Sequence, residues 1–141
     1  MPSLALFDPL AVPTQVGEIN QVRNALENVP ILVGTFWLDF DALSERRMVD
    51  ALESFKLLGS SPILWTLADN RQESVTEAQL QSLLQSCKEA RALRSLELHR
   101  EAKQLKEGAV TTRRDLVNWS KEYLMPSMDV KLWLNKNTGW G

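Results

Sequence analysis

Histidine and cysteine are the side chains that most often act as nucleophile, base or metal ligand, and this chain has one of each. Cys87 and His99 lie twelve residues apart in a segment that predicts one helix, which separates them by about 18 Å along its axis. They therefore cannot form a nucleophile–base pair within one subunit. A zinc site needs three or four N, S or O ligands, and the usual Cys/His set is missing. We interpret Cys87 as a buried small hydrophobe and His99 as a solvated side chain.

A second candidate for chemistry is the pair of carboxylates in the segment Asp39-Phe40-Asp41. This spacing could suit a divalent-cation or nucleotide-sugar site, but the two side chains point the same way only on an extended strand, and no glycine-rich phosphate loop accompanies them. Capping of the next helix is the favoured interpretation. The chain also lacks a dinucleotide-binding fingerprint, a Walker loop and a nucleophile elbow. We therefore predict no catalytic residues, no metal, no cofactor and no enzymatic activity.

The most prominent element predicted by the sequence is one long helix over residues 74–108. Ser74 and Glu77 have the spacing of a capping box, and Gly108 can adopt the left-handed conformation that ends a helix. The helix would be about 50 Å long, whereas a compact domain of this size is only about 37 Å across. It must therefore kink, or one end must pack against something else.

The apolar side chains of this helix fall into two groups on one stripe, separated by Arg91 and Arg94. An inner half runs from Leu80 to Cys87, and an outer half runs from Leu98 to Leu105. We interpret the inner half as holding the fold together and the outer half as offered to a partner. The alternative is that both arginines lie at the edge of an ordinary core and pair with neighbouring glutamates.

The rest of the chain predicts an all-α fold of about five helices packed around the long one. The apolar window 31–40 lacks a convincing partner strand and is expected to form a buried turn, although a strand remains the alternative. The expected domain organisation is an extended N-terminal arm over 1–14, a helical domain over 15–125 and an apolar C-terminal arm over 126–141. The other expected helices cover residues 15–29, 41–58, a short segment from Ser61-Pro62 onward, and 111–124.

Composition restricts the class of protein. The chain has 141 residues, of which 44% are hydrophobic and 24% charged, and a net charge of −2, as expected for a soluble globular domain. No run of about 18 apolar residues predicts a membrane span. The N-terminus lacks the basic region of a signal peptide, and a single cysteine fits a reducing compartment. We therefore predict a cytoplasmic protein that is neither secreted nor membrane-bound.

These features favour a non-enzymatic interaction or assembly subunit that docks onto copies of itself or onto a partner protein. Docking would use the long helix and the two arms, because the N-terminal arm is apolar and the two tryptophans of the C-terminal arm have little to bury them locally. A homo-oligomer is expected. The alternative is a nucleic-acid-associated regulator or packaging factor using residues 88–114, which hold eight basic and four acidic residues. The predicted protein-interface residues are Phe7, Leu98, Ala102, Leu105, Trp133 and Trp140. The predicted anion or nucleic-acid contacts are Lys88, Arg91, Arg94, Arg113 and Arg114.

Overall fold

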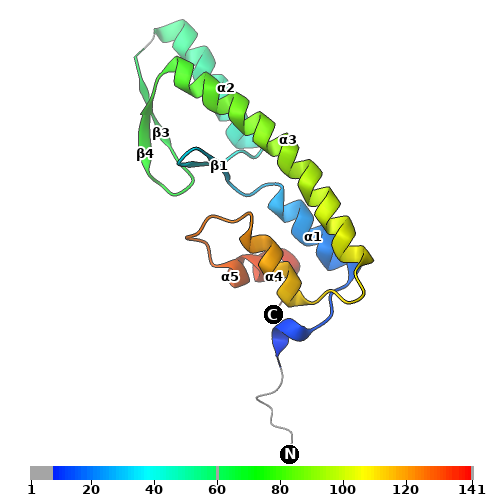
Figure 1. Cartoon of the computed structure of the whole chain (residues 1–141). Helices are drawn as coiled ribbons and strands as arrows, with labels where there is room; N and C mark the ends of the chain where they lie inside the picture. The colour runs from blue at the N-terminus through cyan, green and yellow to red at the C-terminus, as the bar shows by residue number, and fades with distance from the viewer. Residues whose placement is uncertain (1–7, 60, 141) are drawn as a thin grey trace, which may run out of the picture. The chain divides into compact units, whose positions relative to one another are not determined.

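The computed structural model describes residues 8–59 and 61–140, and the predicted interface residue Phe7 lies outside them. The chain is 61% helical, but its described part also contains two small antiparallel sheets of two strands each (Figure 1). The all-α prediction is therefore wrong: the fold is mixed, although helices dominate it. Both sheets are hairpins formed by segments that we expected to be a buried turn and a short helix.

The order of elements along the described chain is as follows. A 3₁₀ helix η2 is followed by helix α1, hairpin β1–β2, helix α2, hairpin β3–β4 and helices α3, α4 and α5. Their bounds are η2 Pro9–Ala11, α1 Val16–Leu26, β1 Ile31–Val33, β2 Phe36–Leu38, α2 Ala42–Leu58, β3 Ile63–Thr66, β4 Gln72–Val75, α3 Glu77–Glu107, α4 Arg113–Lys121 and α5 Val130–Thr138.

The chain divides into two compact units. Unit 1 combines residues 1–27 with residues 96–141, and unit 2 is residues 28–95. Helix α3 contributes to both units, because the division falls between Ser95 and Leu96. Each half of the long helix therefore has buried residues within its own unit.

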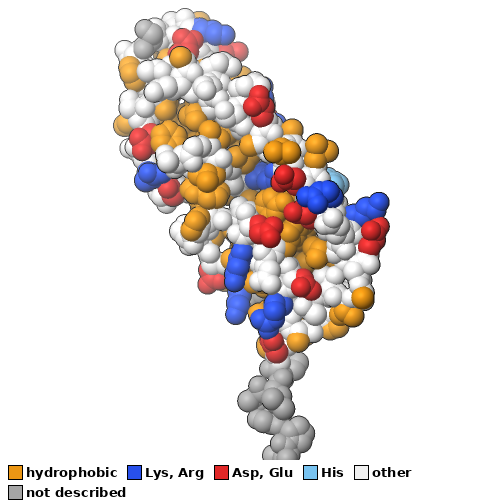
Figure 2. Space-filling model, viewed as in Figure 1, with side chains coloured by type: hydrophobic (Ala, Val, Ile, Leu, Met, Phe, Trp, Pro, Cys, Tyr) orange, Lys and Arg blue, Asp and Glu red, His pale blue; other side chains and the backbone are white. Residues whose placement is uncertain are grey.

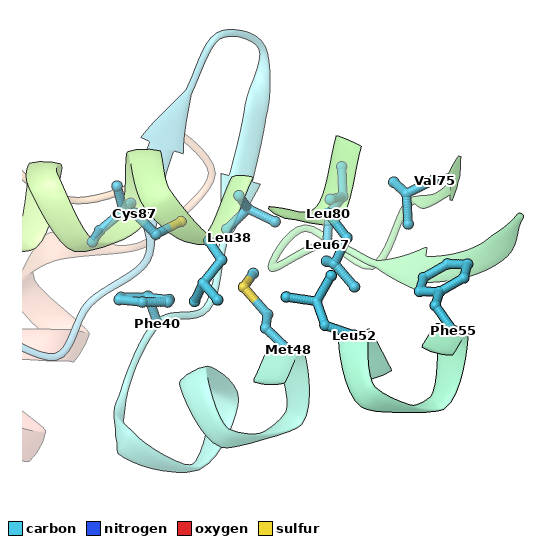
Figure 3. Close-up of a cluster of buried hydrophobic side chains, with 11 residues drawn as sticks. Leu38, Phe40, Met48, Leu52, Phe55, Leu67, Val75, Leu80 and Cys87 are labelled. Atoms are coloured by element: carbon cyan, nitrogen blue, oxygen red, sulfur yellow. The ribbon is translucent and has the colours of Figure 1, made fainter. Parts of the chain in front are cut away.

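Unit 2 has one apolar core to which both hairpins and two helices contribute. Leu38 and Phe40 come from β2 and the segment after it, Met48 comes from α2, and Leu80 and Cys87 come from α3. Figure 3 shows these side chains between the α2 and α3 ribbons, with Phe55 of α2 beneath hairpin β3–β4. The predicted inner half of the long helix is thus buried in this core.

The first hairpin lies entirely within the apolar window 31–40. Strands β1 and β2 pair Ile31 with Leu38 and Val33 with Phe36, leaving a two-residue loop. The first loop residue, Gly34, has a φ of 61°, which suits the primed turns that match the twist of paired strands. The partner strand that seemed to be missing is therefore the second half of the same window.

The second hairpin replaces the short helix expected after Ser61-Pro62. Strands β3 and β4 are joined by a loop in which Leu67 accepts a hydrogen bond from the backbone N–H of Asn70, at 3.0 Å. Asn70 adopts a φ of 70°, as in three-residue hairpin loops that end in a left-handed residue. Because Ser74 belongs to β4, the capping box of α3 lies at Thr76 and Gln79, whose side chains each accept the other residue's backbone N–H.

Unit 1 packs α1, α4, α5 and the second half of α3 together. The predicted C-terminal arm is helix α5, capped by Asp129 and ended by Gly139 in a left-handed conformation. Gly108 does not adopt a positive φ. Instead, the hydroxyl of Thr111 donates to the carbonyl of Leu105 at 2.6 Å, which satisfies one of the free acceptors at the end of α3.

Candidate functional site: the free edge of strand β3

Cys87 and His99, whose side-chain types most often act in catalysis or metal binding, lie in different units. Cys87 is fully buried, and burial raises the pKa of its thiol to about 11, which disfavours the reactive thiolate. His99 is exposed, with Nε2 3.1 Å from Nη1 of Arg23 and Nδ1 3.6 Å from a carboxylate oxygen of Glu27. In the part of the chain that the structure describes, no group of three or more His, Cys, Asp or Glu is placed to hold a metal ion.

The predicted protein-interface residues are mostly covered by their own unit. Leu98 and Ala102 are 0% and 1% exposed, and Leu105 and Trp133 are half-buried. Trp140 is also half-buried, and its indole N–H donates to Glu18 at 2.7 Å. The outer half of the long helix is therefore core of unit 1, which leaves Leu98 and Ala102 no exposed surface to offer.

The predicted anion contacts are dispersed, and four of the five have partners within the chain. Arg91 binds Glu45 at 3.0 Å and lies over the ring of Phe40, while buried Arg94 donates to the carbonyl of Val29 at 2.7 Å. Lys88 is exposed. These interactions occupy the arginines of unit 2 that were expected to contact an anion.

The two arginines of unit 1 are similarly engaged. The guanidinium of Arg113 lies 4.7 Å from the centroid of Trp140 and 3.8 Å from a carboxylate oxygen of Glu18. Arg114 forms an ion pair with Asp8. Two positive charges at the N-terminus of a helix interact unfavourably with the helix dipole. The carboxylates of Glu18 and Asp8 offset those charges.

Strand β3 of unit 2 has one edge that no other strand of the described chain pairs with. In an antiparallel pair, residues that exchange hydrogen bonds alternate with residues that do not. The N–H of Leu67 donates to the carbonyl of Arg71 at 2.8 Å, so the bonded pairs continue at Trp65 and Ile63. The backbone N–H and C=O of Leu64 and Thr66 consequently point away from β4. No other strand pairs with β3 in the described chain.

This free edge is short and has defined ends. At one end stands Pro62, which has no N–H to offer. At the other end, the N–H of Ala68 already donates to the carbonyl of Trp37 at 2.8 Å. Between these ends, only Leu64 and Thr66 present unpaired backbone groups on this side of the hairpin. The edge of Ile63–Thr66 is about 13 Å long.

Hollows of the surface flank this edge, and both are walled by helix α2. One has a volume of about 340 Å³ and is lined by Phe55, Leu58, Pro62 and Ile63 among others. The other has a volume of about 280 Å³, and its β3 wall is Leu64–Thr66. We refer to these two hollows together as the α2–β3 groove and define it by their lining residues. They are Asp39, Ser44, Arg47, Ala51, Ser54, Phe55, Leu58, Gly59 and residues 61–66.

The groove is apolar at one end and carries opposite charges at the other. Burial, and then the neighbouring carboxylate of Asp41, raises the pKa of Asp39, while the positive charge of Arg47 acts in the opposite direction. The pKa of Asp41 is lowered, chiefly because its carboxylate accepts the backbone N–H of Ser44, at 2.8 Å. Asp41 is thus the predicted helix cap, whereas Asp39 and Arg47 line the groove as one acid and one base.

Apolar side chains around the groove are unusually exposed. Leu64 is 66% exposed on β3, and Leu57 and Leu58 are 83% and 88% exposed at the end of α2. Figure 2 shows hydrophobic side chains gathered over the area where Figure 1 labels β1, β3 and β4. None of these residues was among the predicted sites, although the β-branched and aromatic content of residues 63–66 directly after a proline is a signal for an edge strand.

Two further findings bear on the class of protein. Among residues 8–59 and 61–140, none of the helices combines the length and apolar character that a membrane crossing requires. Comparison of the chain with protein-family models, with curated proteins and with solved structures found no match.

Proposed function

We propose that this chain is a non-enzymatic interaction subunit that binds an extended protein segment along the free edge of β3. The observation that carries the proposal is the pair of outward-facing backbone groups at Leu64 and Thr66, which lies directly beside the α2–β3 groove. A strand edge next to a helix is a recurrent way to bind peptides: the backbone supplies hydrogen bonds, and alternate side chains enter pockets.

The composition of the edge supports this proposal. Proteins usually protect an exposed edge with lysine, proline or a bulge, because unpaired strands recruit other chains. Strand β3 carries no charged residue, and the side chain of Leu64 is 66% exposed to solvent. Pro62 guards only one end. An edge left open in this way is well suited to receive a partner strand.

The groove also specifies the chemistry of the occupant. Its wider end is lined by Phe55, Leu58 and Ile63, which favours an apolar side chain. The opposite end has one carboxylate and one guanidinium, Asp39 and Arg47, and therefore no excess of either charge. The expected occupant is an extended, apolar segment with little net charge.

This proposal moves the docking surface away from the long helix, because Leu98 and Ala102 are already covered by unit 1. The nucleic-acid alternative gains no support from the geometry, since Arg91 and Arg94 bind groups of their own unit. A protein partner in the α2–β3 groove would use neither the predicted interface residues nor the predicted anion contacts.

The proposal is tested with a displayed library of heptapeptides and two proline variants. Thr66→Pro removes an outward-facing N–H from β3, and the matched control Gln72→Pro removes the equivalent N–H of its cross-strand neighbour on β4. Neither change removes a bond between β3 and β4. Library peptides should bind the wild type and the control but not Thr66→Pro. Peptides that bind all three proteins equally would refute the proposal, and so would an absence of binders when the wild type is monomeric.

A further inference from the structure

Resting on the proposed function, we infer that the segment bound at the free edge is strand β3 of a second copy of this chain. Two copies would pair antiparallel about a two-fold axis at Trp65. The result is one four-stranded sheet in the order β4–β3–β3–β4. The inference follows from which positions on the edge are open and which are closed.

Only two positions on the edge can exchange hydrogen bonds with another strand. Leu64 and Thr66 each present a free N–H and C=O. The positions on either side, which we call closed, have no free donor, because Pro62 lacks an N–H and the N–H of Ala68 is bonded to Trp37. A partner strand can therefore exchange pairs of hydrogen bonds with this edge only at Leu64 and Thr66.

With the axis at Trp65, the edge matches itself. Leu64 lies opposite Thr66 of the second copy and Thr66 lies opposite Leu64 of the second copy, so both open positions of each copy are used. Each bonded antiparallel pair exchanges two hydrogen bonds, so four bonds join the strands. The closed positions, Pro62 and Ala68, then also lie opposite each other.

Neighbouring antiparallel registers match poorly. Moving the axis to Leu64 places Thr66 opposite Pro62, which has no N–H to donate. Moving the axis to Thr66 places Leu64 opposite Ala68, whose N–H is already used. Each shift leaves one backbone carbonyl of each copy without a donor, that of Thr66 in the first case and that of Leu64 in the second. Of these three registers, only the one centred on Trp65 pairs the N–H and the C=O of both Leu64 and Thr66 in each copy.

The chemistry of the strand agrees with this geometry. The groove favours an apolar segment with little net charge, and Ile63–Thr66 is such a segment. Pairing places Leu64 beside Thr66 of the second copy on the same face, which covers part of an apolar side chain that is 66% exposed in the single chain. It also removes the unprotected edge, because each β3 becomes an inner strand.

The register is tested by cysteine cross-linking of two single variants, Leu64→Cys and Thr66→Cys. Directly opposite residues can form a disulfide, whereas Leu64 and its own copy would lie diagonally, at about 7–8 Å, beyond disulfide reach. Oxidation of a mixture should therefore yield the mixed dimer, and either variant alone should remain monomeric on a non-reducing gel. Efficient self-linkage of Leu64→Cys, or no linkage in the mixture, would overturn the inference. The native Cys87 is buried and does not interfere.

The mass of the full chain provides the second measurement. Sedimentation equilibrium should give a dimer for the wild type and for Gln72→Pro. Thr66→Pro should weaken the dimer at least about tenfold, because two of the four bonds lose their donors. If Thr66→Pro fails to fold, Leu64→Lys serves the same purpose, since a lysine on an exposed edge disfavours pairing. A wild-type mass equal to one chain at all concentrations would refute the second copy as occupant.

These results separate the inference from the proposed function. A monomeric wild type that still binds library peptides in a manner sensitive to Thr66→Pro keeps the free edge as a docking site but assigns it to another protein. A dimer whose strength is unaffected by Thr66→Pro refutes the pairing of β3 strands. A monomer that binds no library peptide removes both the inference and the function on which it rests.

Discussion

The replacement Leu98→Ala should destabilise the protein without changing its oligomeric mass. Leu98 is 0% exposed within unit 1, and truncation of a buried leucine removes its apolar contacts and leaves a cavity. The expected loss in the free energy of unfolding is about 3 kcal/mol, within the usual range of about 2–5 kcal/mol for such changes. Leu96, on the same helix, is 72% exposed, so Leu96→Ala should change stability by no more than about 0.5 kcal/mol.

Urea denaturation of the wild type and both variants, followed by far-UV circular dichroism and by tryptophan fluorescence, measures these differences. Two probes are needed because the chain has two units, and coincident transitions would justify a single free energy. Light scattering at matched concentration gives the mass. A Leu98→Ala variant as stable as Leu96→Ala but of altered mass would refute the reasoning, because it would show that Leu98 faces a partner rather than the core.

Three further predictions follow from individual side chains. Arg94→Met should lower the free energy of unfolding by about 1–3 kcal/mol in urea denaturation, because the buried carbonyl of Val29 loses its donor; unchanged stability would contradict this. Asp41→Asn should weaken the acid dependence of stability, since a carboxyl whose pKa is lowered in the folded state stabilises above its ordinary pKa and loses that effect as the pH falls; an unchanged pH–stability curve would contradict it. Cys87 should react with a thiol reagent at neutral pH only as fast as unit 2 opens, because its thiol is buried and its pKa is raised to about 11; rapid labelling of the native protein would disagree.

Helices were largely predictable because their boundaries depend on local signals. Asp41 caps α2 and Gly59, with a φ of 103°, follows its last residue, as expected from the residue types. Thr112 and Asp115 form the capping box of α4, and Pro30 follows the region of α1. The long helix was recognised, but its start was placed at Ser74 instead of Thr76, because both residues are followed three positions later by a suitable capping partner.

Hairpins were missed because their signals are pairwise. Gly34 and Thr35 between two apolar runs indicate a tight turn, but each run has only three residues and neither predicts a strand unless it is paired with the other. Pro62 after serine resembles a helix start, and only the left-handed Asn70 and the pairing with Gln72–Val75 distinguish a hairpin. Local residue types alone do not decide whether such a segment forms a helix or a strand, because strand pairing depends on both partners.

The candidate site could not be derived from the sequence, because it depends on tertiary proximity. The backbone groups of Leu64 and Thr66 are known to point away from β4 only once the pairing of β3 with β4 is known. That the N–H of Ala68 is already used follows only from its hydrogen bond to Trp37. Conversely, the predicted interface at Leu98 rested on the assumption of one compact body. Residues of unit 1 cover that half of α3, and the length of the helix alone does not show which residues those are.

The measurement that most directly tests the central claim is residue-resolved amide hydrogen exchange of Leu64 and Thr66 by NMR as a function of protein concentration. If β3 pairs with a second copy, both amides should exchange rapidly in dilute protein and become protected together as concentration rises. The N–H of Trp65, which bonds within the hairpin, should be protected throughout and provides the internal control. Amides of Leu64 and Thr66 that stay unprotected at every concentration, with or without bound library peptide, would contradict the account.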